Sequence, residues 1–284
     1  MKFKIALAQI DPALGNFPAN VQKHVEFATR ARDAGAELVV FPELSLTGYT
    51  IKDMNWELAV NLERDISSLE PLRELGNSIS ILAGGVEESS NFGIYNSAFF
   101  FEDGVVKSVH RKTYPPTYGM FEEMRYFNSG SSVKAFDSKL GRLGVLICED
   151  LWHLSLPYML AQDGANLIIA LVASPTRLGG NEKELQTARV NSENHKAYAR
   201  LLTTYLAFCN RTGYEDGINF WGGSAVVGPD GEMDAQAKLF DEDLIFTMID
   251  DDAVRRARRF SRHFLDDKLD VVLTELHRIQ SSRQ

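Results

Sequence analysis

The sequence predicts an α/β fold with one main domain. Short apolar runs typical of strands alternate with stretches of helical spacing along most of the 284 residues. No internal repeat, low-complexity segment or linker rich in Pro and Ser divides the chain. Residues 1–252 are therefore expected to form a single domain. Residues 253–284 follow the last strand with helical spacing and are expected to form a tail that packs on the core or at a subunit interface.

The first half of the chain is expected to supply five strands and two helices. Strands are predicted where apolar runs stop at turn residues, namely residues 3–9, 38–41, 79–85, 98–101 and 105–109. Helices are predicted from apolar residues at helical spacing, over residues 20–34 and 56–75. The Asp-Gly pair at positions 103–104 predicts a hairpin turn. Residues 111–130, with their prolines and glycines, are expected to form a long loop, and such loops are often functional.

The second half is predicted to continue the alternation. Strands are expected at residues 143–147, 167–173, 205–209, 224–227 and 244–249, and helices at residues 157–163 and 183–202.

Composition and charge exclude several classes of function. The net charge of -9 and the pI of about 5.2 argue against a nucleic-acid or anionic-membrane partner. The dense basic run at residues 255–259 is expected to be a solvated or subunit-contacting helix face. Only two cysteines occur and no apolar stretch approaches the roughly 18 residues that span a bilayer. We expect a cytoplasmic, reduced protein.

Three reactive residues each follow an apolar strand directly: Glu43, Lys112 and Cys148. Strand ends are where α/β proteins keep their chemistry, so these side chains could converge at one edge of a sheet. Each residue taken alone also has an ordinary interpretation. A lone Cys is often a small buried hydrophobe, a lone Glu a helix cap or ion-pair partner, and a lone Lys part of a solvated turn.

Together the three residues fit nucleophilic catalysis by a thiol. A Cys needs a nearby base before it can attack an amide, and Glu43 can take the proton of Cys148. Lys112 can stabilise the negative charge that develops on the substrate oxygen, and the backbone N–H of Glu149 can act as a second oxyanion donor.

Three segments resemble the signature motifs of the nitrilase, or carbon–nitrogen hydrolase, superfamily: FPELSLTGY, RKTYPPTYGMFEEMRYF and GVLICEDLW. The resemblance extends over roughly residues 3 to 250. It implies a four-layer α-β-β-α sandwich of the nitrilase type that forms a homodimer or higher homo-oligomer. It also implies Glu43 as general base, Lys112 as the lysine that stabilises the transition state and Cys148 as nucleophile. Glu123 is implied as an additional active-site acid.

Residues 148–152, 173–175, 210–213 and 222–224 resemble the glutamine-hydrolysing domain of glutamine-dependent NAD synthetases. The sequence stops at position 284, without the synthetase domain. The expected activity is therefore that of a cofactor-independent thiol amidohydrolase, which cleaves a small-molecule amide through a Cys thioester and releases ammonia or an amine. A glutaminase subunit of a separate synthetase is the alternative. A nitrilase, an acyltransferase or an inactive binding protein also stays open.

The remaining candidates are weaker. Tyr49 and Trp152 flank the motifs and are expected either to line the substrate pocket or to pack in the core. Arg177 is a candidate for holding a substrate carboxylate, with a surface role as the alternative, and Arg189 is an equally weak candidate. Cys209 is expected to be structural. No metal site is expected, because no Cys or His cluster has the spacing of metal ligands, and no glycine-rich phosphate loop occurs.

Overall fold

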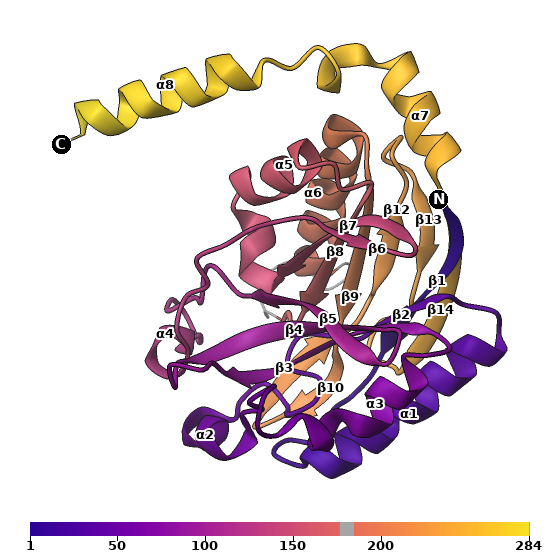
Figure 1. Cartoon of the computed structure of the whole chain (residues 1–284), viewed down its shortest axis with the longest axis vertical. Coiled ribbons are helices and arrows are strands. Elements are labelled where there is room, and N and C mark those ends of the chain that lie inside the picture. Colours follow the sequence, from indigo (N-terminus) through magenta and orange to yellow (C-terminus); the bar gives the residue numbers. More distant parts are fainter. Residues whose placement is uncertain (177–184, 284) are drawn as a thin grey trace.

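Two six-stranded sheets pack face to face in the computed structural model, which describes residues 1–176 and 185–283 (Figure 1). The first sheet has the order β14 (Asp243–Asp250), β1 (Lys2–Gln9), β2 (Leu38–Val40), β3 (Ser80–Glu88), β4 (Ile94–Glu102) and β5 (Val105–Arg111). The second has the order β13 (Met233–Gln236), β12 (Ala225–Val227), β9 (Tyr205–Asn210), β8 (Leu167–Val172), β7 (Gly141–Ile147) and β6 (Phe136–Ser138).

The space between the sheets is filled by alternate residues of their strands. On β1 the inward residues Phe3, Ile5 and Leu7 are at most 1% exposed, and they share one core with residues of β7, β8 and β9 in the other sheet. Alternation follows from strand geometry, in which successive side chains point to opposite faces. Each fully buried Leu or Ile stabilises the fold by about 1.5–3 kcal/mol, so this inner core holds the sheets together.

Helices cover the outer face of each sheet and complete four layers, as the resemblance implied. Helices α1 (Phe17–Asp33) and α3 (Glu70–Leu75) pack on the first sheet. Helices α5 (Ser155–Gln162) and α6 (Gln186–Leu202) pack on the second. Asn16 caps α1 by accepting the N–H of Ala19 at 3.3 Å, and Pro18 lies in the first turn, where its missing N–H costs no hydrogen bond.

The strand directions bring the functional loops to one end of the sandwich. β1, β2 and β3 are parallel, and β5 runs the same way because β4 is antiparallel to both of its neighbours. β7, β8 and β9 are also parallel to one another. Glu43 and Lys112 therefore follow strands of the first sheet, and Cys148 follows a strand of the second. The expectation of a single sheet edge was wrong, because the site lies where the ends of two facing sheets meet.

The predicted helix over residues 56–75 is broken into short pieces. The structure has η1 (Lys52–Met54), α2 (Asn55–Leu58), η2 (Ile66–Leu69) and α3 in this region. Pro71 lies in the first turn of α3. Proline lacks an N–H and cannot continue a helix from the preceding turn, so a new helix begins here. Val60 pairs with Glu87 of β3 in an isolated bridge. The chain between α2 and η2 is therefore not helical.

Several short elements were not predicted, among them β6, β13 and the following two features. A separate hairpin consists of β10 (Thr212–Glu215) and β11 (Ile218–Trp221). A short helix, α4 (Glu123–Tyr126), interrupts the predicted loop 111–130. The predicted helix 183–202 is seen from Gln186, and its first two positions fall outside the described residues.

The last residues form α7 (Asp251–Phe260), η4 (Arg262–Phe264) and α8 (Leu269–Ser282). Val254 of α7 packs into the core between the sheets, whereas α8 has no buried residue and extends away from the body of the chain (Figure 1). The division into a domain of residues 1–252 and a tail stays a prediction. Among the described residues, none of the helices combines the length and the apolar character that crossing a membrane requires.

Candidate active site

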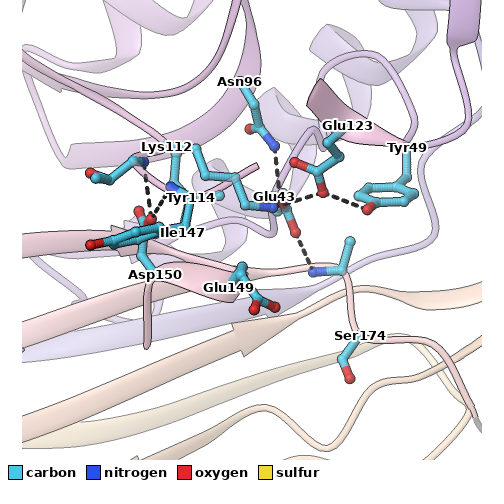
Figure 2. A network of polar contacts seen from close by, with 12 residues as sticks. Glu43, Tyr49, Asn96, Lys112, Tyr114, Glu123, Ile147, Glu149, Asp150 and Ser174 are labelled. Carbon is cyan, nitrogen blue, oxygen red and sulfur yellow. Dashed lines mark hydrogen bonds and ion pairs between the residues drawn. The ribbon is translucent and has the colours of Figure 1, made fainter. Parts of the chain in front are cut away.

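Glu43 lies at the centre of a buried polar cluster, three residues after the end of β2 (Figure 2). Its Oε1 accepts hydrogen bonds from Lys112 Nζ at 2.7 Å and from Asn96 Nδ2 at 2.8 Å. Its Oε2 accepts the backbone N–H of Ala173 at 2.9 Å, at the end of β8. The side chain is 1% exposed, so these donors replace water and fix the orientation of the carboxylate.

Close backbone packing sets the position of Glu43. Gly84 on β3 lies against the 42–44 backbone, and a Cβ at position 84 would lie 2.5 Å from the nitrogen of Leu44. Only glycine fits such a close approach of two backbone segments.

Lys112 follows β5 directly and is also buried. Its Nζ donates to Glu43 and, at 2.8 Å, to Oε1 of Glu123. The charges of these two carboxylates raise the pKa of Lys112 well above its ordinary value, although burial acts in the opposite direction. Lys112 is therefore a permanent cation at neutral pH, as stabilisation of a developing oxyanion requires.

Glu123 begins the short helix α4 and completes the cluster. Its Oε1 accepts from Lys112 and from the hydroxyl of Tyr49 at 2.5 Å, while its buried Oε2 has no hydrogen-bond partner. Burial raises the pKa of Glu123 to about 7, against the opposing effect of the Lys112 charge. Figure 2 shows the carboxyl of Glu123 between Glu43 and Tyr49.

Cys148 stands at the junction of β7 and the short 3₁₀ helix η3 (Cys148–Trp152), with φ of +47°. This left-handed conformation is rare for a residue with a Cβ, and strained positions of this kind are concentrated at functional sites. The side chain is partly accessible and contributes to the wall of a cavity. Burial, followed by the charge of Glu43, raises the pKa of the Cys148 thiol well above its usual range. The resting group is a thiol, which needs a base in order to attack.

Asp150 connects the nucleophile turn to the loop that carries Lys112. It is fully buried, and its Oδ1 accepts the backbone N–H groups of Thr113 and Tyr114, both at 2.9 Å. Its Oδ2 accepts the N–H of Ile147 at 3.2 Å and lies 3.1 Å from Nε2 of His110. One carboxylate therefore fixes the residue before Cys148 relative to the residues after Lys112, across the two sheets.

A cavity of about 440 Å³ opens beside Cys148. Its wall includes Glu149 and Trp152 of η3, Tyr118 and Ser174. The hydroxyl of Tyr118 donates to Oε2 of Glu149 at 2.8 Å, and Trp152 is half exposed. This volume is in the range of a small-molecule site. Its position beside Cys148 makes this cavity the candidate substrate pocket.

The structure joins Glu43, Lys112, Glu123 and Tyr49 in one hydrogen-bonded cluster, and Cys148, Glu149 and Trp152 line the cavity. The prediction that Tyr49 lines the pocket remains untested, but the structure gives its buried hydroxyl a partner in Glu123. Arg177 lies outside the described residues, and Arg189 is paired with Glu193 at 3.0 Å on the surface of α6. Cys209 is fully buried in the core between the sheets.

Two functional residues were missed, and only one left a signal in the sequence. Asn96 is a polar residue inside the apolar run of β4, where an amide must have a specific partner. Asp150 looked like an ordinary acidic residue in a turn, because Thr113, Tyr114 and His110, three of its four partners, come from a distant segment. No group of three or more His, Cys, Asp or Glu side chains with the arrangement of a metal site occurs within residues 1–176 and 185–283.

The geometry agrees with the family that the three sequence motifs resemble. The model of the carbon–nitrogen hydrolase family matches residues 4–259. The chain belongs to the carbon–nitrogen hydrolase family. It is thus a hydrolase of carbon–nitrogen bonds other than peptide bonds. Some members of the family resemble the chain in sequence, and others in fold alone.

The chain is 34% identical over 248 residues to a glutamine-dependent NAD(+) synthetase of Acinetobacter baylyi, covering 87% of this chain and 44% of the synthetase. The solved glutamine-dependent NAD+ synthetase of Acinetobacter baumannii superposes with a TM-score of 0.81 at 33% identity, over 89% of this chain and 47% of that one. A carbon–nitrogen hydrolase of Helicobacter pylori shares the fold, with a TM-score of 0.87 at 23% identity over 97% and 99% of the two chains. This chain thus spans less than half the length of the synthetases that it matches.

Proposed function

We propose that this protein is a thiol amidohydrolase that cleaves the side-chain amide of a small amino-acid-like substrate, with glutamine as the first candidate. The observation that carries the proposal is the position of Cys148, which lines the pocket and follows β7 next to β8, whose following residue Ala173 donates to Glu43. Burial and the charge of Glu43 raise the pKa of the Cys148 thiol and the charge of Lys112 lowers it, so the thiol depends on a base.

The reaction begins with attack of the Cys148 sulfur on the amide carbon. As the S–C bond forms, Glu43 takes the thiol proton, and Lys112 and the N–H of Glu149 stabilise the oxyanion. Collapse of the tetrahedral adduct breaks the C–N bond, Glu43 returns the proton to the departing nitrogen, and ammonia leaves. Water then attacks the thioester carbon while Glu43 accepts its proton, the C–S bond breaks, and Glu43 returns the proton to the departing sulfur as the acid leaves. No cofactor enters this sequence.

The pocket supports a substrate that carries an ammonium group. Glu149 follows Cys148 directly, and its side chain, 15% exposed, contributes a carboxylate to the pocket wall. A carboxylate at this position favours a cationic group of the substrate over an anionic one. The α-amino group of glutamine is such a cation, and the relatives named above are glutamine-dependent.

Ammonia release from a panel of amides tests this substrate class. Glutamine should be turned over better than its analogue without the amino group, than aliphatic amides and than nitriles. Glu149→Gln should raise KM for glutamine about tenfold, because one partly buried ion pair is lost, and should leave the des-amino analogue within about twofold. Equal KM changes for both compounds, or a preference for simple aliphatic amides, would contradict the assignment.

A glutaminase subunit that supplies ammonia to a separate synthetase is the second candidate. It is favoured by the match to synthetases over less than half their length. In this case glutamine hydrolysis by this chain alone should be slow and should rise when an ammonia-dependent NAD synthetase is added. Full glutamine turnover without a partner would count against this candidate.

We further propose that two copies of the chain associate through α8. Helix α8 carries apolar side chains that are each at least 37% exposed, namely Leu269, Val271, Leu273, Leu276 and Ile279. Leu154 and Met159 near α5 and Leu201 on α6 are also exposed, so the same chain offers apolar surface on its body that a second copy's α8 can cover.

Light scattering after gel filtration should give about twice the 31.8 kDa mass of one chain. Leu273→Glu combined with Leu276→Glu should reduce that mass to one chain, because burying two carboxylates in an apolar interface is unfavourable. Glu275→Gln, on the same helix, is the matched control and should leave the mass unchanged. A monomeric wild type would refute the association.

A further inference from the structure

The hairpin β10–β11 holds the loop that carries Tyr49 through one side chain. Oε1 of Glu215, at the end of β10, accepts the backbone N–H of Tyr49 at 2.8 Å and that of Thr50 at 2.6 Å. It also accepts the hydroxyl of Thr50 at 2.9 Å. Glu215 is 4% exposed. Three donors from two consecutive residues of a distant loop thus converge on one oxygen.

The other oxygen of Glu215 is held by a buried cation. Arg211 is fully buried, and its Nη1 donates to Oε2 of Glu215 at 2.5 Å. The guanidinium also lies 4.2 Å from the centre of the Phe220 ring, and the ring centres of Tyr49 and Phe220 lie 5.9 Å apart in an edge-to-face arrangement. Glu215 therefore has little freedom to move, and Tyr49 is fixed through both its backbone and its ring.

Gly48 makes this contact possible. Its φ is +84°, and a Cβ at this position would lie 2.9 Å from Oε2 of Glu215 and 2.8 Å from the Cα of Leu14. Any side chain here would be strained and would separate the loop from the hairpin. The chain thus brings the Tyr49 loop directly onto the Glu215 carboxylate.

We propose that Glu215 is a positioning residue of the active site, which fixes the Tyr49 loop so that the Tyr49 hydroxyl holds Glu123 against Lys112. The connection runs from Glu215 to the backbone of Tyr49, from the Tyr49 hydroxyl to Glu123 at 2.5 Å, and from Glu123 to Lys112 at 2.8 Å. It deepens the amide hydrolysis proposed above and rests on it for its kinetic consequences.

The hydroxyl of Tyr49 matters because Glu123 is buried. The Tyr49 hydrogen bond favours the charged form of Glu123 and lowers its pKa, against the larger effect of burial. Without the hydrogen bond from its backbone N–H to Glu215, the Tyr49 hydroxyl would no longer be held in position to donate to Glu123. Glu123 would then bind a proton more tightly and attract Lys112 less, which would weaken the orientation of the lysine toward the substrate oxygen.

A double-mutant cycle between Tyr49→Phe and Glu215→Gln tests the connection. Tyr49→Phe should lower kcat/KM about ten- to a hundredfold, as expected for one hydrogen bond to a charged group. Glu215→Gln should lower kcat/KM about tenfold, because a glutamine amide has one accepting oxygen whereas the carboxylate accepts at both Oε1 and Oε2. The double variant should lie within about twofold of Tyr49→Phe, since Glu215 acts through the hydroxyl that is already missing.

Asp216→Asn is the matched control. Asp216 is the next residue of the same hairpin and pairs with Lys52 at the surface, 3.0 Å away. This variant should stay within about twofold of wild type. Losses that multiply in the double variant, or an equal loss in Asp216→Asn, would overturn the proposal, since either result would mean that the hairpin contributes only general support.

A titration separates this inference from the proposed function, because it needs no substrate. The carboxyl carbon of Glu123, assigned in carbon-13 NMR spectra by its absence in Glu123→Gln, should titrate at higher pH in Tyr49→Phe and in Glu215→Gln than in wild type. Asp216→Asn should leave the midpoint unchanged. If both variants titrate like wild type, Glu215 does not act on Glu123, whether or not the protein hydrolyses glutamine.

Discussion

Cys148→Ala is expected to lower kcat/KM for any amide substrate at least about 10⁴-fold, since loss of a nucleophile removes the covalent route altogether. The substitution removes one partly accessible sulfur beside a cavity, so the fold and the thermal midpoint should change little. Ammonia release and circular dichroism, measured on the same preparation, give both quantities. A variant that keeps a tenth or more of wild-type activity would contradict the assignment of Cys148 as nucleophile.

Cys209→Ala is the matched control for that prediction. Cys209 ends β9, and its sulfur is buried near the carbonyl oxygens of Ala8 and Val40. Its side chain is 0% exposed in the core between the sheets, so a substrate cannot reach the thiol and it is no candidate nucleophile. The variant should lose about 1 kcal/mol of stability from the small cavity and keep its activity within about twofold. Alkylation of the folded protein should therefore modify Cys148 and spare Cys209.

Lys112→Met is expected to damage both activity and stability. The ammonium of Lys112 is the partner that Glu43 and Glu123 share, and its removal leaves two carboxylates in a buried site. Breaking a buried ion pair from one side costs about 3–5 kcal/mol. The loss of oxyanion stabilisation should lower kcat about 10²- to 10³-fold or more. Urea unfolding and steady-state kinetics measure the two effects.

The stability loss in Lys112→Met should depend on pH in a direction that identifies its cause. The pKa of Glu123 is already raised by burial and held down by the charge of Lys112, so removing the cation raises the pKa of Glu123 further in the folded state. A raised folded pKa contributes stability at low pH that is lost as the pH rises, so Lys112→Met should lose stability relative to wild type between about pH 4.5 and pH 8. A loss that is the same at all pH values would point to packing instead.

Lys52→Met is the control for Lys112→Met. Lys52 forms an ion pair with Asp216 in which both side chains are at least half exposed. Such surface pairs contribute little, so this variant should match wild type in both activity and unfolding. The comparison separates the removal of a lysine in general from the removal of the buried one.

Much of the fold was predictable because its signals are local. The alternation of inward and outward residues on β1, and the apolar run before Cys148, are visible within a few positions of sequence. The three motifs then indicated the family, and the family model and the two facing sheets confirm that prediction. The long helix predicted at 56–75 failed because helical spacing alone gave too little weight to Pro71.

The site was predictable at its reactive residues and not at the residues that hold them. Glu43, Lys112 and Cys148 were found from strand ends and motifs, and their roles stay predictions until the variants above are measured. Asn96, Asp150 and Glu215 each have hydrogen-bond partners in segments 36 to 166 positions away. No spacing rule connects such positions, because strand pairing and sheet packing bring them together. The same reason hid the division of the site between two sheets.

The most direct test of the account is whether amide and ester substrates pass through one acyl-enzyme. Glutamine and the γ-methyl ester of glutamate should be turned over in the presence of hydroxylamine, and the ratio of hydroxamate to free acid measured for each. Both compounds give the same thioester on Cys148, so the ratio should be the same for both and independent of the leaving group. A ratio that differs between the two, or ammonia release without any hydroxamate, would show that the bond is cleaved without the common thioester and would contradict the account.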